Sequence, residues 1–203
     1  MALLAALLGS GCLAGAAWIH VKARLAQMLI ARAWERRVHG EALARPWPWA
    51  DTVPLARLAV PGARPLEFFV LEGSSGRNLA FGPAHDPASV LPGEPGNSVI
   101  AGHRDTSFGF LGSLRPGDRL RIERAGRQTW FSVSDVRVVD SRRTRIALGG
   151  DAPRLTLVTC YPLDGLAYGG PLRWVVTADA VPDVLARPGA HRPQGGGVSV
   201  RAR

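Results

Sequence analysis

The chain has 203 residues, 46% of them hydrophobic and 20% charged, which is ordinary for one globular domain with an appendage. Its formal net charge of +9 invites a nucleic-acid-binding interpretation. The central residues 46–186 are nearly neutral, however, with 15 Arg against 14 Asp and Glu. The excess lies in residues 20–45 and 187–203, so we expect no basic face on the domain and no nucleic-acid partner.

The N-terminal run from Ala2 to Ile19 has no charged residue. It predicts a transmembrane anchor or signal-anchor over residues 1–20, because about 20 apolar residues span a bilayer. Two other interpretations remain open: a cleaved signal peptide, and a lipoprotein signal that ends at Cys12. The basic residues follow the run and none precedes it, a layout that by the positive-inside tendency favours a cytoplasmic domain.

A basic stem is expected over residues 21–45. Apolar side chains recur at helical spacing from Val21 to Leu29, which predicts that the N-terminal helix continues to about Arg37. Basic residues beside an apolar segment favour contact with a membrane surface. The connector that follows, Pro-Trp-Pro-Trp at residues 46–49, excludes regular structure, and we expect its tryptophans to pack onto the domain.

Short β segments separated by turn residues fill residues 46–182. Seven or eight short strands with little helix are typical of a closed β-barrel or a sandwich, so the fold is expected to be mainly β. We expect a hairpin turn at residues 125–127, a short helix within residues 82–89, and a disordered basic tail over residues 183–203. The expected strands lie near residues 55–60, 66–71, 98–101, 119–124, 130–139, 155–159 and 172–178.

Three of the expected strands have a reactive side chain at one end. His103 follows the strand near residues 98–101, and Cys160 ends the strand near residues 155–159. Arg173 is near the start of the strand near residues 172–178. Each alone is more often structural or a surface residue. Together they supply a general acid/base, a nucleophile and a fixed cation. Cysteine attack on an amide gives an oxyanion and then a thioester, and an imidazolium can protonate the leaving amine.

Residues 156–160 read Thr-Leu-Val-Thr-Cys, which resembles the Thr-Leu-x-Thr-Cys signature of sortases. His103 lies 57 residues before Cys160 and Arg173 lies 13 after it, which is similar to the order and separations of the sortase His–Cys–Arg triad. Further segments resemble the class GN sortases of Gram-negative, marine proteobacterial type. They are residues 46–52, 79–83, 101–106 and 169–173.

The resemblance implies a closed eight-stranded β-barrel with short helices, held by a single-pass N-terminal helix at the inner membrane with the catalytic domain in the periplasm. It implies a transpeptidase that cleaves a C-terminal sorting signal like Leu-Pro-x-Thr-Gly and passes the acyl group to an amine. In that scheme Cys160 is the nucleophile, His103 the acid/base and Arg173 the oxyanion stabiliser. The implied partner is a single cognate target protein that carries the signal.

Two further residues are candidates for positioning this triad. Asp105 lies two residues after His103 and could orient it, although a turn-forming role is an equal alternative. Thr159 is the second candidate, directly before Cys160. The Cys and His residues do not have zinc-site spacing, and no glycine-rich phosphate loop precedes a helix, so we expect neither a metal nor another cofactor.

Two other functions remain open. The same barrel could be a hydrolytic cysteine peptidase, because water and amines compete for a thioester. The papain arrangement does not fit, since papain places Cys before His and on a helix. The second alternative is non-enzymatic: a membrane-tethered β-barrel binding module in which Cys160 is inert.

Overall fold

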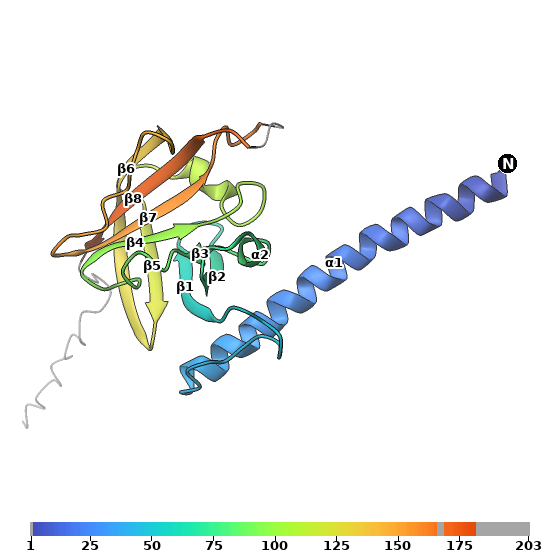
Figure 1. Cartoon of the computed structure of the whole chain (residues 1–203), viewed down its shortest axis with the longest axis horizontal. Helices are drawn as coiled ribbons and strands as arrows, with labels where there is room; N and C mark the ends of the chain where they lie inside the picture. Colours follow the sequence, from blue (N-terminus) through green and yellow to red (C-terminus); the bar gives the residue numbers. More distant parts are fainter. Residues whose placement is uncertain (1, 166–168, 182–203) are drawn as a thin grey trace, which may run out of the picture.

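In the computed structural model, eight strands close into one barrel. The structure describes residues 2–165 and 169–181. Side chains are described for all of these residues except 2–17, 19 and 20. The mainly β, closed eight-stranded architecture is therefore confirmed (Figure 1). Around the barrel the strands follow the order β1-β2-β3-β4-β7-β8-β6-β5. They are β1 (Pro54–Val60), β2 (Leu66–Glu72), β3 (Ala84–His85), β4 (Gly96–Ala101), β5 (Arg119–Arg124), β6 (Arg127–Asp140), β7 (Pro153–Cys160) and β8 (Leu172–Val181).

The barrel is filled by the inward side chains of alternate strand residues, as the period of two predicts. Phe108, Leu111 and Leu114, from the connection between β4 and β5, pack against the same core. The core residues from the strands are Ala56, Leu58, Val70, Ile100, Leu120, Ile122, Phe131, Val133, Leu155, Leu157, Val176 and Ala178. The hairpin turn expected after β5 is confirmed, because Arg124 pairs with Arg127 across Ala125 and Gly126.

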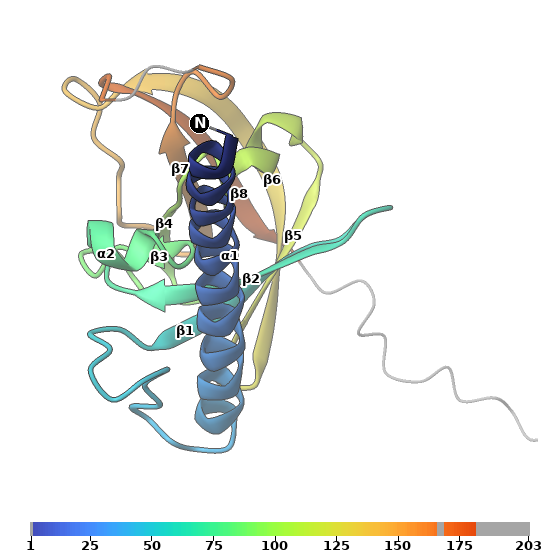
Figure 2. The ribbon, with the colours of Figure 1, turned by 90° about the vertical axis from the view of Figure 1, so that its right-hand side faces the viewer.

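The helix α1 (Ala2–Val38) ends within a residue of the expected boundary. Its C-terminal half packs on β1 and β2 through buried side chains that include Ile30 and Trp34, and its N-terminal half extends away from the barrel (Figures 1 and 2). In the part of the chain with described side chains, no helix is both long and apolar enough to cross a membrane.

Two of the sequence expectations, the membrane anchor and the disordered tail, cannot be compared with the structure. The side chains of the expected anchor at residues 1–20 are mostly outside the described set, so the anchor stays a prediction. The expected tail at residues 183–203 lies outside the described residues.

The short helix expected within residues 82–89 is wrong. This segment holds β3, which pairs in parallel with β2 through Ala84 and antiparallel with β4. Extended backbone there closes the barrel between two longer strands, and this tertiary pairing overrides local preference. The helical turns lie elsewhere, in α2 (Gly76–Leu79) and in the 3-10 helix η1 (Gly109–Ser113).

The two tryptophans of the connector behave differently. Trp47 packs onto the domain as expected, edge-on to Phe81 with ring centroids 5.1 Å apart. Trp49 is 82% exposed, so the expectation for it is wrong. The backbone N–H of Ala50 donates to the Trp47 carbonyl at 3.0 Å, which makes a tight turn with Trp49 at its outer corner.

Candidate active site

His103, Cys160 and Arg173 form a row at one rim of the barrel, at or just beyond the ends of the neighbouring strands β4, β7 and β8. The parallel strands β4 and β7 pair with a constant register that ends at Ala101 opposite Val158, and Gly102 N–H extends it to the Val158 carbonyl at 3.1 Å. His103 is the next residue after Gly102, and Cys160 comes two residues after Val158, so both lie just past the end of this parallel ladder, at the same rim. Cys160 is in turn paired with Arg173 across the antiparallel β7–β8 ladder. The structure thus brings all three sequence-predicted residues to this rim.

Cys160 is the last residue of β7 and is exposed. It belongs to the outward set of β7, because Leu155 and Leu157 face the core. Pro162 comes two residues after Cys160, and because it has no N–H to donate it stops the ladder. Among the described residues the thiol has no hydrogen-bond partner, so a substrate can reach it.

His103 is also exposed and begins a tight turn. Its carbonyl accepts the backbone N–H of Phe108 at 2.9 Å, and the Phe108 ring is fully buried beneath the turn. Gly102 is required there, since a Cβ at this position would lie 2.7 Å from that ring. No group in the described part of the chain hydrogen-bonds the imidazole, which leaves it available for proton transfer.

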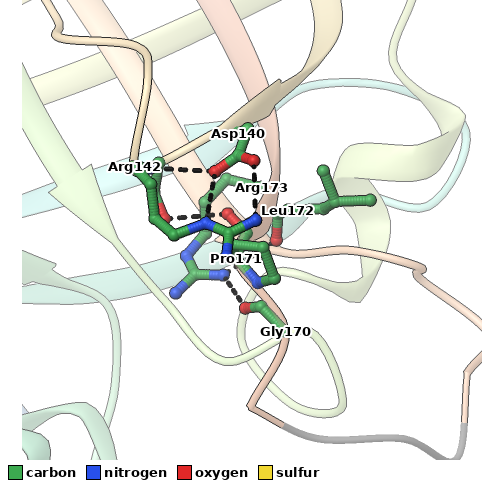
Figure 3. Close-up of polar contacts among 7 residues, drawn as sticks. Asp140, Arg142, Gly170, Pro171, Leu172 and Arg173 are labelled. Atoms are coloured by element: carbon green, nitrogen blue, oxygen red, sulfur yellow. Dashed lines mark hydrogen bonds and ion pairs between the residues drawn. The ribbon is translucent and has the colours of Figure 1, made fainter.

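Arg173 is held at the start of β8 by the loop that precedes it. Its Nη1 donates to the carbonyls of Gly170 at 2.7 Å and Leu172 at 2.8 Å (Figure 3). Beside it lies the Asp140–Arg142 pair, in which the Arg142 guanidinium hydrogen-bonds the carboxylate and lowers the pKa of Asp140 (Figure 3). Arg173 therefore presents a fixed cation at the rim, next to a pair that is already neutralised.

The two candidate positioning residues lie in different settings. Thr159 is buried, and its Oγ1 donates to the Gly102 carbonyl at 2.7 Å, so it links the end of β7 to the residue before His103. Asp105 lies beyond the end of β4, where strand alternation no longer applies, and its Oδ1 is 3.3 Å from Nε of Arg104.

Arg104 was missed by sequence reasoning. It is only 4% exposed, and its guanidinium donates to the carbonyls of Pro162 and Gly165, both at 2.5 Å. In the sequence it stood out only as the residue after His103, within the segment 101–106 that resembles the class GN sortases. Arginine is usually a surface residue, so burial of this one could not be inferred.

A large cavity lies to one side of the row. It has a volume of about 800 Å³ and is bounded by α1, β2 and the segment before β3. Thr106 and Ser107 line it, so it borders the turn that begins at His103. The row itself is on the open rim, where a chain could reach the thiol from solvent.

The arrangement suits nucleophilic acyl transfer. An exposed thiol, an exposed imidazole and a fixed guanidinium share one row, which are the groups needed to attack a carbonyl, move a proton and stabilise an oxyanion. The β7–β8 pairing sets Cys160 opposite Arg173, and His103 follows the end of β4 by two residues. Rigid elements hold such groups more precisely than loops do.

Comparison with known proteins agrees with this geometry. The sortase domain model matches residues 58–181, which is more than half of the chain. Sortase D of Bacillus subtilis (strain 168) is 32% identical over 111 residues, 54% of this chain and 56% of that protein. The chain thus spans about half the length of this curated relative.

Solved structures extend the similarity to the fold. Sortase C-1 from Actinomyces oris is 30% identical, with a TM-score of 0.56 over 64% of this chain and 73% of that one. A lid mutant of sortase A from Corynebacterium diphtheriae is 26% identical, with a TM-score of 0.58 over 66% and 73% of the two chains. With its closed barrel and the matched domain, this chain belongs to the sortase family.

Proposed function

We propose that this chain is a cysteine transpeptidase that cleaves a C-terminal sorting signal like Leu-Pro-x-Thr-Gly and transfers the acyl group to an amine. The observation that carries the proposal is that His103, Cys160 and Arg173 lie at one rim of the barrel, where β4 and β7 end and β8 begins. Membership of the sortase family supports the same chemistry.

In the first half-reaction, the Cys160 thiolate attacks the carbonyl carbon of the scissile Thr–Gly bond. A C–S bond forms, and the carbonyl electron pair moves to oxygen, where the Arg173 guanidinium stabilises the negative charge. The oxyanion then collapses and the C–N bond breaks. The His103 imidazolium gives its proton to the departing amine, leaving a thioester on Cys160 and a neutral imidazole.

In the second half-reaction, an incoming amine attacks the thioester carbonyl. His103 takes a proton from the amine as the new C–N bond forms, which regenerates the imidazolium. The C–S bond breaks and the thiolate leaves. The catalytic state therefore needs the Cys160 thiolate and the His103 imidazolium together.

We also propose the setting of this activity. The class GN type, and with it one cognate target protein, is supported by the segments 46–52 and 101–106. An N-terminal membrane anchor is supported by the uncharged run from Ala2 to Ile19. We place the barrel in the periplasm because the resemblance to class GN sortases implies it, although the basic residues after the run favour the opposite side. Trp18 is 58% exposed with Lys22 Nζ 5.1 Å from its ring centroid, a combination typical of membrane interfaces.

Mass spectrometry of the protein with a library of sorting-signal peptides tests the proposal, with Cys160→Ala as the control. We expect a thioester adduct on Cys160 and, when an amine is added, a transpeptidation product. Release of acid with no amine product would instead favour the hydrolytic peptidase. The binding module would be favoured by two results together. No peptide would acylate Cys160, and the rate of Cys160 alkylation by iodoacetamide would be the same in wild type and His103→Ala at every pH.

A further inference from the structure

Arg104 is an arginine buried inside the active-site rim. Its two terminal nitrogens reach the carbonyls of Pro162 and Gly165, which belong to the loop that follows the nucleophile. Its Nε contacts the carboxylate of Asp105, which supplies a partner charge. Burying a cation costs free energy unless it is paired and hydrogen-bonded, and these three contacts offset that cost for Arg104.

The loop is packed closely around the guanidinium. A Cβ at Gly165 would lie 2.5 Å from the ring of Pro162 and 3.5 Å from Nη1 of Arg104. The planar fork of arginine can hold two carbonyls in a fixed relation, which a lysine ammonium cannot do in the same geometry. The conformation of the loop after Cys160 thus depends on this side chain.

The ladder between β4 and β7 ends before the catalytic residues. Among the described residues, the last backbone hydrogen bond between the β4 and β7 segments is from the Gly102 N–H to the Val158 carbonyl. Beyond it, side chains link them: Thr159 reaches the residue before His103, and Arg104 extends from the residue after it. His103 is therefore bracketed by two contacts to the chain that carries Cys160.

We infer that Arg104 is a positioning residue for acyl transfer: by clamping the Pro162 and Gly165 carbonyls it keeps the imidazole of His103 in register with the thiol of Cys160. This inference rests on the proposed function for its kinetic consequences. The effect of Arg104 on how His103 changes the reactivity of the Cys160 thiol can be measured without any substrate. Loss of the clamp lets the two turns shift, and a misplacement near 1 Å costs up to about 100-fold in rate.

The test compares Arg104→Lys with Arg57→Lys in the full chain. Arg57, on β1, is partly buried and forms ion pairs with Glu67 on β2 and Glu123 on β5, so it controls for the general cost of replacing a paired arginine. Three quantities are measured: the melting temperature, the rate of Cys160 alkylation by iodoacetamide against pH, and kcat and KM with a sorting-signal peptide.

We expect Arg104→Lys to lower kcat about 10- to 100-fold with KM changed by less than about threefold. The pH profile of alkylation should move toward that of His103→Ala, whereas Arg57→Lys should keep the wild-type profile. Wild-type kcat and a wild-type alkylation profile in Arg104→Lys would overturn the inference. So would a loss of kcat no greater than the fraction of the variant that is unfolded at the assay temperature.

Gly165→Ala is the second variant, because it disturbs the same loop without removing the arginine. The added Cβ must displace the ring of Pro162, so this variant should show the same displaced alkylation profile and lowered kcat. A wild-type profile in folded Gly165→Ala would also contradict the inference. If no peptide acylates the wild-type protein, the proposed function fails, yet the alkylation measurements still decide the role of Arg104.

Discussion

Cys160 and Arg173 are directly opposite each other at the last pair of the β7–β8 ladder. Opposite residues of an antiparallel pair have Cβ atoms about 5 Å apart and side chains on the same face. The guanidinium can therefore reach the oxygen of a carbonyl that the thiol attacks. Strand register alone thus places the proposed nucleophile and the proposed oxyanion donor side by side.

Arg173→Lys should be nearly as damaging as Arg173→Ala. Lysine keeps the charge but loses the planar fork, of which Nη1 is already used to hold the Gly170 and Leu172 carbonyls. We expect either change to slow acylation about 10²- to 10³-fold, the scale for one oxyanion donor. Single-turnover thioester formation measures this. Recovery of most of the rate by lysine would mean that charge alone suffices.

Cys160→Ala should abolish thioester formation and leave the fold intact. The side chain is exposed at a strand end, so its loss should change the free energy of unfolding by no more than about 0.5 kcal/mol. Peptide cleavage and chemical denaturation are measured on the same sample. Cleavage near the wild-type rate in the variant would reject Cys160 as the nucleophile.

Thr159→Val should harm the site, whereas Thr159→Ser should be tolerated. Valine has the shape of threonine but cannot donate to the Gly102 carbonyl, and losing a buried hydrogen bond costs about 1–3 kcal/mol. We expect the valine variant to lose stability by this amount and to acylate at least about tenfold more slowly, because Gly102 precedes His103. Equal rates for the two variants would show that the hydroxyl does not position the imidazole.

Acid should weaken the Asp140–Arg142 pair beside Arg173. The hydrogen bond from Arg142 lowers the pKa of Asp140 below its usual value near 3.8, so the folded state favours the carboxylate. Its stabilising effect is therefore fully present above the unfolded pKa and is lost as the pH falls through the lower folded pKa. The difference in unfolding free energy between wild type and Asp140→Asn should be constant at neutral pH and shrink below about pH 4. A difference that persists unchanged to pH 2 would contradict this.

The enzyme should not acylate its own barrel. Residues 46–203 contain no lysine, because Lys22 is the only one in the chain, and arginine is too weak a nucleophile to replace it. After incubation of the full chain with a sorting-signal peptide, we expect acyl groups only on Cys160, Lys22 or the N-terminal amine. Tandem mass spectrometry that finds a stable adduct elsewhere within residues 46–203 would refute the prediction.

Most strands could be predicted from the sequence because their local signals are strong. The alternation in residues 119–124 and the turn after it define β5 and its hairpin without tertiary information. Ala84 and His85 of β3 carry no such signal, since two residues show no period. They are extended because β2 and β4 lie on either side of them.

The sequence by itself determined which residues could form the site, since His103, Cys160 and Arg173 each stand at the end of a recognisable strand. The tertiary structure alone decided how they meet: a parallel pair puts the ends of β4 and β7 at one rim, and the β7–β8 register sets Arg173 opposite the thiol. It also decided that Arg104 is buried against the loop after Cys160. The β4–β7 pairing and the Arg104 contact join residues 57 and 58 positions apart, and local periodicity carries no information about contacts at that range.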